Sequence, residues 1–263
     1  SITNNYGLAI IFFAFIAKVL MLPVSVKSEL GRRKMVKVQP KLQALQQKYK
    51  NNTRDQRYMD EVQAVYREEG YSQMSGCLPT LIQFPLIMGL WNAIRNPLTY
   101  VCGLVEKTMY PIFQKLTELG VENLGTWDLA ANKKAINEIA IAQGIDQYGD
   151  QLSGLLPEGF RNIDLNFFGL NLGDKPVFGW DWTILIPIIS ALTSFLVGYI
   201  GQRINRTKGA QQDPTQKSMN FVLYTMPLIS LWMGFSFQIG VGIYWIFSNI
   251  FSLIQTALLP LCL

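Results

Sequence analysis

The chain has 263 residues, of which 49% are hydrophobic and 16% are charged, and its formal net charge is +5. A mean hydropathy of +0.18 is typical of a membrane protein with several spans and substantial polar connections. No histidine occurs in the sequence, which excludes Ser-His-Asp and Cys-His catalysis and the H-E-x-x-H zinc site. The three cysteines lie far apart, so no C-x-x-C metal or redox motif exists, and we expect no metal site and no cofactor. We also expect no enzymatic activity, because the chain lacks histidine and its apolar stretches lack carboxylates.

The first apolar stretch, Tyr6 to Val24, is long enough to span a bilayer but contains a lysine. At roughly 1.5 Å of rise per residue, Lys18 lies about 18 Å along a helix that starts at Tyr6, near the middle of the membrane. A cation there costs about 2.5–3.5 kcal/mol and usually faces a water-filled cavity or a partner. The alternative is a lysine whose stem carries the charge to the interface, which works poorly from mid-membrane.

Five stretches in all are apolar enough to span, and the fourth should begin earlier than its apolar core, around Met219. Within the second span, Gln83 and Asn92 are polar groups at membrane depth, and such groups most often form hydrogen bonds between helices. No predicted span contains a carboxylate, and this argues against a proton relay or an ion pump. The stretches are Tyr6 to Val24, Leu78 to Leu98, Trp182 to Ile200, Phe221 to Ser236 and Val241 to Leu259.

Charge distinguishes the connections between these spans. Residues 27–69 hold eleven Lys/Arg and six Asp/Glu, and residues 203–217 hold four Lys/Arg against one Asp, whereas residues 103–181 hold six Lys/Arg and eleven Asp/Glu. The positive-inside rule therefore places the first two segments in the cytoplasm and the third outside. The predicted topology has the N-terminus outside and the C-terminus inside.

The first cytoplasmic segment is predicted to form a helical hairpin. Apolar residues recur at steps of three and four from Met35 to Tyr49, and a capping box at Thr53 and Gln56 precedes a second helix. This basic, amphipathic hairpin could bind anionic lipid headgroups or an RNA-bearing partner such as a ribosome, or could be an ordinary positive-inside loop. Its second apolar face comprises Met59, Val62 and Tyr66.

The long outer segment is predicted to form a small, partly helical lobe. Apolar spacing indicates helices over 105–119 and 129–143. Trp180 and Trp182 lie where an interfacial aromatic belt is expected. In the last span, Tyr244, Ser248 and Gln255 have helical spacing, and the first two lie one turn apart. One cation among hydroxyls and amides suggests a groove that could hold a polar stretch of another chain.

Several motifs together resemble the YidC/Oxa/Alb family of membrane protein insertases, in its bacterial form of Gram-positive type. They cover about two thirds of the chain in the family's order, although each is weak alone. The motifs are Asn5-Tyr-Gly-Leu-Ala-Ile-Ile running to Lys18 and Leu22-Pro23, Gln39-Pro40-Lys41-Leu42, Gly76-Cys77-Leu78-Pro79 with Gln83-Phe84-Pro85, and Gly242-Ile243-Tyr244-Trp245 with Ser248-Asn249.

The resemblance implies an all-α polytopic protein of the bacterial plasma membrane, with five transmembrane helices and a hydrophilic groove open to the cytoplasm. Lys18 stands where the family has an arginine, and it keeps the charge without the forked donors. Tyr244 and Trp245 match the family's aromatic substrate-contact pair, and Gln83 and Ser248 complete the predicted groove. The predicted contact residues of the hairpin are Arg32, Arg33, Lys34, Lys37 and Lys41.

Two features depart from the family pattern: an outer insertion of about 70 residues, and a chain that stops at Leu263 without a basic tail. Because it also begins at Ser1 without a methionine, we expect both termini to be truncated. The predicted regions are a first span (1–26), the cytoplasmic hairpin (27–75), a second span (76–102), the outer insertion (103–179), a third span (180–202), a linker (203–217), a fourth span (218–238) and a fifth span (239–263).

The function that these patterns favour is a membrane protein insertase and chaperone, which moves nascent membrane proteins from the cytoplasm into the bilayer. Expected partners are nascent substrates, membrane lipids, a ribosome and the Sec translocon, and the protein is expected to be a monomer. The alternative is a transporter or channel for small anions that bind Lys18. Transporters commonly have paired inverted repeats, which five unequal spans fit poorly.

Overall fold

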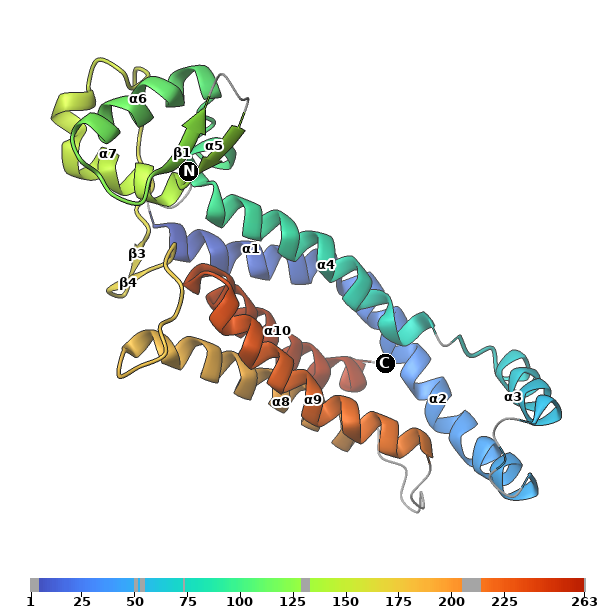
Figure 1. The fold of residues 1–263 in the computed structure, drawn as a ribbon. Coiled ribbons are helices and arrows are strands. Elements are labelled where there is room, and N and C mark those ends of the chain that lie inside the picture. The colour runs from blue at the N-terminus through green and yellow to red at the C-terminus, as the bar shows by residue number, and fades with distance from the viewer. Residues whose placement is uncertain are drawn as a thin grey trace. The chain divides into compact units, whose positions relative to one another are not determined.

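The computed structural model describes residues 5–49, 52, 55–72, 74–128, 133–204 and 214–262, and it is mainly helical (Figure 1). The predicted cap at Thr53 and most of the predicted linker 203–217 lie outside these residues. The elements in chain order are α1 (Tyr6–Leu20), α2 (Leu22–Lys48), α3 (Gln56–Glu68), α4 (Met74–Arg95), α5 (Pro97–Tyr100), α6 (Glu106–Glu118), β1 (Gly125–Asp128), β2 (Lys133–Ile136), α7 (Glu138–Leu152), β3 (Asn166–Phe167), β4 (Leu170–Asn171), the 3-10 helix η1 (Trp182–Ile184), α8 (Leu185–Ile204), α9 (Pro214–Ser236) and α10 (Ile239–Cys262).

Two helical stretches in the described part of the chain are long and apolar enough to cross a membrane, Trp182–Ile204 and Ile239–Leu258. A third is present if α1 and α2, which are separated by a break at Met21, count as one bent span. The second and fourth predicted spans coincide with helices α4 and α9. That these two also cross the membrane stays a prediction.

The chain forms two compact units, which are described separately. The first comprises Ser1–Phe12, Leu86–Ile186 and Gly234–Tyr244, and the second comprises Phe13–Pro85, Pro187–Met233 and Trp245–Leu263. In the first unit, α6 packs on α7 and buries Met109, Ile112 and Leu116 in the main hydrophobic core. These positions lie three and four residues apart, so one face of an amphipathic helix forms the core.

One predicted helix of the outer segment is confirmed and the other is partly wrong. Helix α6 matches the prediction over 105–119. The predicted helix over 129–143 instead contains strand β2, which pairs antiparallel with β1, and α7 begins only at Glu138. The side chain of Asn137 caps α7 by accepting a hydrogen bond from the Ala140 N–H. Pairing between two strands is a contact that helical spacing does not report.

A buried carboxylate joins α5 to α7 within the first unit. Glu138 accepts hydrogen bonds from the backbone N–H of Thr99 at 2.8 Å and from its hydroxyl at 2.5 Å. The glutamate is only 2% exposed, so these donors compensate for its removal from water. Together with the α6–α7 core, this contact gives the lobe its own folded interior.

Truncation of Leu116 to alanine should destabilise the lobe by about 2–5 kcal/mol, because it leaves a cavity in the packed α6–α7 core. The measurement is denaturant unfolding of the full chain in detergent, followed by resistance of the lobe to proteolysis. The matched control is Val105→Ala, at a position that is 63% exposed, and a change within about 0.5 kcal/mol is expected there. Equal losses in both variants would contradict the assignment of Leu116 to the core.

Candidate functional site

The lysine of α1 is held by a hydroxyl of α10 in the second unit. The partly buried Nζ of Lys18 donates to Oγ of Ser252 at 2.8 Å. The Ser252 hydroxyl in turn donates to the backbone carbonyl of Ser248, one turn earlier, at 2.9 Å. An ammonium on a helix as apolar as α1 needs polar partners of this kind.

Further contacts bring α1 and α10 together at the same place. The side-chain amide of Gln255 donates to the backbone carbonyl of Lys18 at 3.4 Å, and the rings of Phe15 and Phe251 meet edge to face at 5.5 Å. The hydroxyl of Ser252 and the amide of Gln255 lie three residues apart on α10 and therefore on one face. This polar stripe of α10 lies against the α1 lysine.

Other polar side chains connect α10 to α8 and α8 to α9 in the same unit. The amide of Asn249 donates to the Thr193 hydroxyl at 3.1 Å and to the Ser190 carbonyl at 3.4 Å. The hydroxyl of Ser230 donates to that of Ser194 at 3.4 Å. Hydrogen bonds of this kind between apolar helices fix their relative register.

The structure brings together only some of the predicted groove residues. Lys18 and the buried Ser248 lie at the same site, connected through Ser252. Gln83 on α4 and Trp245 on α10 are half-buried in the same unit, whereas Tyr244 is fully buried in the first unit. The substrate-contact roles of all five residues stay predictions.

Sequence reasoning missed Ser252, the direct partner of Lys18. Its signal was present, because Ser248, Ser252 and Gln255 follow the spacing i, i+4, i+7 of a single helical face. The pattern shows a polar stripe on the last helix without showing which other helix the stripe meets.

The predicted hairpin is present and consists of α2 and α3, which run antiparallel (Figure 1). Val38 and Leu42 are buried on α2, and the rings of Tyr49 and Tyr58 meet at 5.9 Å. The predicted apolar face of α3 was partly wrong: Met59 is 48% exposed, and its neighbour Tyr58 is the buried residue.

The start of α3 also differs from the prediction. Its cap is Asp55, whose carboxylate accepts a hydrogen bond from the Arg57 N–H at 2.9 Å. A cap at Asp55 moves the first helical position to Gln56, which the predicted capping box had placed inside the first turn.

Several hairpin cations are engaged within the hairpin. Nζ of Lys41 lies 2.6 Å from a carboxylate oxygen of Glu69, and Nζ of Lys48 lies 2.6 Å from one of Glu61. Nζ of Lys34 donates to the carbonyl of Gly70 at 3.0 Å. Two of the predicted contact residues, Lys34 and Lys41, therefore hold α3 against α2.

The other predicted hairpin contacts remain predictions. Lys37 is exposed and Arg33 is half-buried on α2, while the side chain of Arg32 lies outside the described part of the chain. The structure thus leaves Lys37 as an exposed cation on the hairpin surface.

The ion pairs shift the pKa values of their members. Hydrogen bonds to Glu69 and Glu61 raise the pKa of Lys41 and of Lys48, and the same contacts lower the pKa of both carboxyl groups. The hydrogen bond from the Tyr49 hydroxyl to Glu61, at 2.8 Å, raises the tyrosine's pKa.

These features define a helical integral membrane protein. It has apolar helices long enough to cross a membrane, a lysine of α1 bound to α10, and a charged hairpin. A family model described as "60Kd inner membrane protein" matches residues 1–260 of the chain. The chain belongs to this family, which is the YidC/Oxa/Alb family, and the resemblance seen in the sequence motifs is confirmed. Its family and its apolar helices place it in the bacterial plasma membrane.

The relatives it matches are named as insertases. The chain is 25% identical to "Membrane protein insertase YidC 2" of Listeria innocua, over 97% of this chain and 64% of the relative. It is 27% identical to "Membrane protein insertase YidC" of Treponema denticola, over 97% of this chain and 34% of that protein. It is 22% identical to "Membrane protein insertase MisCA" of Bacillus subtilis, over 97% of this chain and 70% of that protein. The chain thus spans less than two thirds of the first two proteins.

We expect the α2–α3 pairing to be strongest across the neutral range. The lowered carboxyl pKa values contribute stability above the ordinary value of 4.5, which is lost as pH falls through the folded pKa. The raised lysine pKa values contribute stability below 10.5, which is lost as pH rises through the folded pKa. Protection of the α3 amides, which is the intrinsic exchange rate at a given pH divided by the observed rate, should be greatest between these limits and should decrease outside them.

The variant that tests this prediction is Glu61→Gln. It removes the ion pair with Lys48, so the decrease in α3 protection at acid pH should become smaller. It should also raise α3 exchange at neutral pH in low salt, because exposed ion pairs weaken with ionic strength. Protection that does not change with pH in the unchanged chain would contradict the role of these pairs.

Proposed function

We propose that this chain is a membrane protein insertase and chaperone that moves nascent membrane proteins from the cytoplasm into the bilayer. Its family and the names of its relatives support this activity. The observation that carries the proposal is the lysine on the apolar helix α1, hydrogen-bonded to a neutral hydroxyl of α10. That lysine is placed to attract an acidic or polar residue of a translocating segment.

Because the partner of Lys18 is a neutral hydroxyl, a charged group of a substrate can replace it. The bond from the Lys18 ammonium to Ser252 has one charged partner, whereas a substrate carboxylate would add the Coulomb attraction between two opposite charges, so the carboxylate competes well with Ser252. Polar groups along α10 would shorten the low-dielectric path that the substrate's charged residue must cross. The apolar part of the substrate then leaves into lipid, driven by about 25 cal/mol for each Å² of apolar surface removed from water.

The same proposal includes the number of spans and their orientation in the membrane. The protein would have five spans, with the N-terminus outside and the C-terminus inside, and a hydrophilic groove open to the cytoplasm. The charge asymmetry between residues 27–69 and 103–181 supports this orientation. The α2–α3 hairpin would then lie in the cytoplasm and the lobe of α6 and α7 outside.

The hairpin would receive the nascent chain. Its cations suit anionic lipid headgroups and the RNA of a ribosome, and the exposed Lys37 is one such contact. The Sec translocon is a further proposed partner. The protein would act as a monomer and without chemical catalysis, since insertion needs no bond to be formed or broken.

Replacement of Lys18 tests the proposal in cells depleted of their native insertase, with insertion of a single-span client read by protease protection. Lys18→Arg should support insertion, because it keeps the positive charge. Lys18→Ala and Lys18→Glu should reduce it by about tenfold or more, because the charge that attracts acidic client residues is lost or reversed. The matched control is Lys27→Ala, at an exposed lysine. Equal rescue by all of these variants would overturn the role of Lys18.

A charge swap separates recognition from folding. A client whose acidic residue is replaced by lysine should be inserted better by Lys18→Glu than by the unchanged chain. If Lys18→Glu fails equally with both clients while its membrane abundance is normal, direct pairing with the client is wrong.

The hydroxyl of Ser252 should position the lysine. Ser252→Ala keeps the charge but removes the acceptor of Nζ, so insertion should fall by only a fewfold, in line with about 1 kcal/mol for one hydrogen bond. Ser252→Thr retains a hydroxyl and should restore insertion. A loss with Ser252→Ala as large as with Lys18→Ala would contradict a positioning role.

A further inference from the structure

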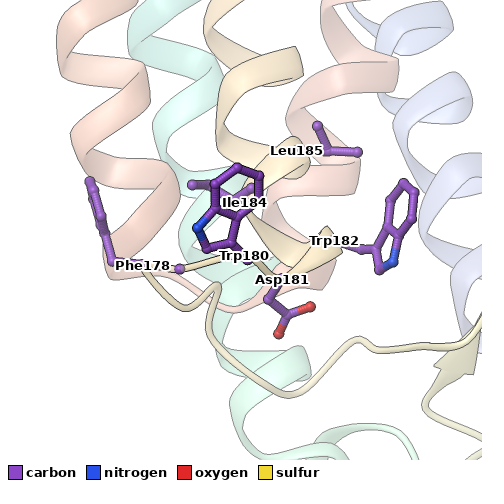
Figure 2. Close-up of a pocket in the computed structure, with 7 residues that line it drawn as sticks. Phe178, Trp180, Asp181, Trp182, Ile184 and Leu185 are labelled. Atoms are coloured by element: carbon purple, nitrogen blue, oxygen red, sulfur yellow. The ribbon is translucent and has the colours of Figure 1, made fainter.

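An apolar cavity of about 640 Å³ lies where the outer segment leads into α8. Among the residues that line the cavity, Figure 2 shows Phe178 and Trp182 at the two sides, with Trp180 and Ile184 between them. The volume falls within the range of about 300–1,000 Å³ that is typical of small-ligand sites. The lining residues are Phe178, Gly179, Trp180, Asp181, Trp182, Ile184 and Leu185.

Local contacts give the cavity a defined shape. The N–H of Val177 donates to the Thr183 hydroxyl at 3.2 Å, and the N–H of Thr183 donates to the Asp181 carboxylate at 3.3 Å. These bonds close the turn that carries the two tryptophans. The ring of Phe178 packs on that of Phe235 at 4.6 Å, which fixes one wall of the cavity.

The position of the cavity follows from the span that it adjoins. Trp182 is the first residue of the candidate span Trp182–Ile204, so the cavity lies at the level where hydrocarbon meets headgroups. Leu185, Ile188 and Leu192 follow at helical spacing on α8 and are all exposed. Within the first unit, the exposed Leu185 also lines the cavity, so the cavity wall includes the first residue of α8.

We propose that this cavity binds one glycerophospholipid of the leaflet next to the lobe. One acyl chain enters between the aromatic rings and contacts Ile184 and Leu185. The exposed indoles of Trp180 and Trp182 supply N–H donors for ester and phosphate oxygens. The Asp181 carboxylate projects from the apolar group (Figure 2) and disfavours anionic headgroups, so a zwitterionic, amine-bearing lipid fits best.

The site does not depend on the insertase activity, because it uses none of the residues around Lys18. A lipid held here would fix the height of the lobe against the membrane surface. A second copy of the chain is the competing occupant of such an exposed apolar site.

The test is a titration of the full chain in detergent with a brominated, zwitterionic ethanolamine phospholipid, read by quenching of tryptophan fluorescence. One bound lipid gives quenching that saturates, whereas general contact with the micelle gives quenching that rises linearly with bromolipid. Six tryptophans contribute to the signal, so the variant with both Trp180→Phe and Trp182→Phe should lose the saturable part.

Filling the cavity tests the site with both indoles kept. A side chain added at Gly179 meets open space, and so does one at Gly154, which serves as the matched control. Gly179→Leu should weaken the saturable quenching by about tenfold or more, because it displaces part of the acyl chain, while Gly154→Leu should leave it unchanged. Linear quenching in the unchanged chain, or equal affinity with Gly179→Leu, would overturn the proposal. So would dimerisation that Gly179→Leu abolishes, since a second copy would then occupy the cavity.

Discussion

An ammonium group on an apolar helix must find polar partners, and the partner of Lys18 comes from a helix 234 residues further along the chain. This requirement holds α1 against α10, and the ring contact between Phe15 and Phe251 follows from the same approach. Because unpaired charge is so costly in hydrocarbon, the pairing restricts how the two helices can slide or rotate. The contact thereby sets the position of α10 relative to the part of α1 in the second unit.

Weaker hydrogen bonds also fix α8 and α9 relative to α10. Asn249 reaches from α10 to Thr193 on α8, and Ser230 reaches from α9 to Ser194. Hydrogen bonds between membrane helices average only about 0.6 kcal/mol each, so their value lies in setting register more than in total stability. The result is a set of apolar helices with polar groups concentrated on the faces where they meet.

The parts outside the apolar helices are stabilised by different forces. The lobe of the first unit has a packed core between α6 and α7, whereas the hairpin depends on a narrow apolar seam and exposed ion pairs such as Lys41 with Glu69. Exposed pairs are screened by salt and rearrange easily. The hairpin should therefore respond to salt and pH more strongly than the packed core of the lobe.

The sequence by itself determined where most helices lie, because apolar residues recur about every 3.6 residues along an amphipathic helix, as they do in α6. It also marked Lys18 as exceptional, since a charge in an apolar run is visible without any structure. Only the tertiary structure decided that Ser252 receives this lysine, that Tyr58 and not Met59 is buried, and that residues 133–136 form a strand. Each of these depends on contacts between residues that local spacing cannot bring together, and their energies exceed the small differences in intrinsic propensity.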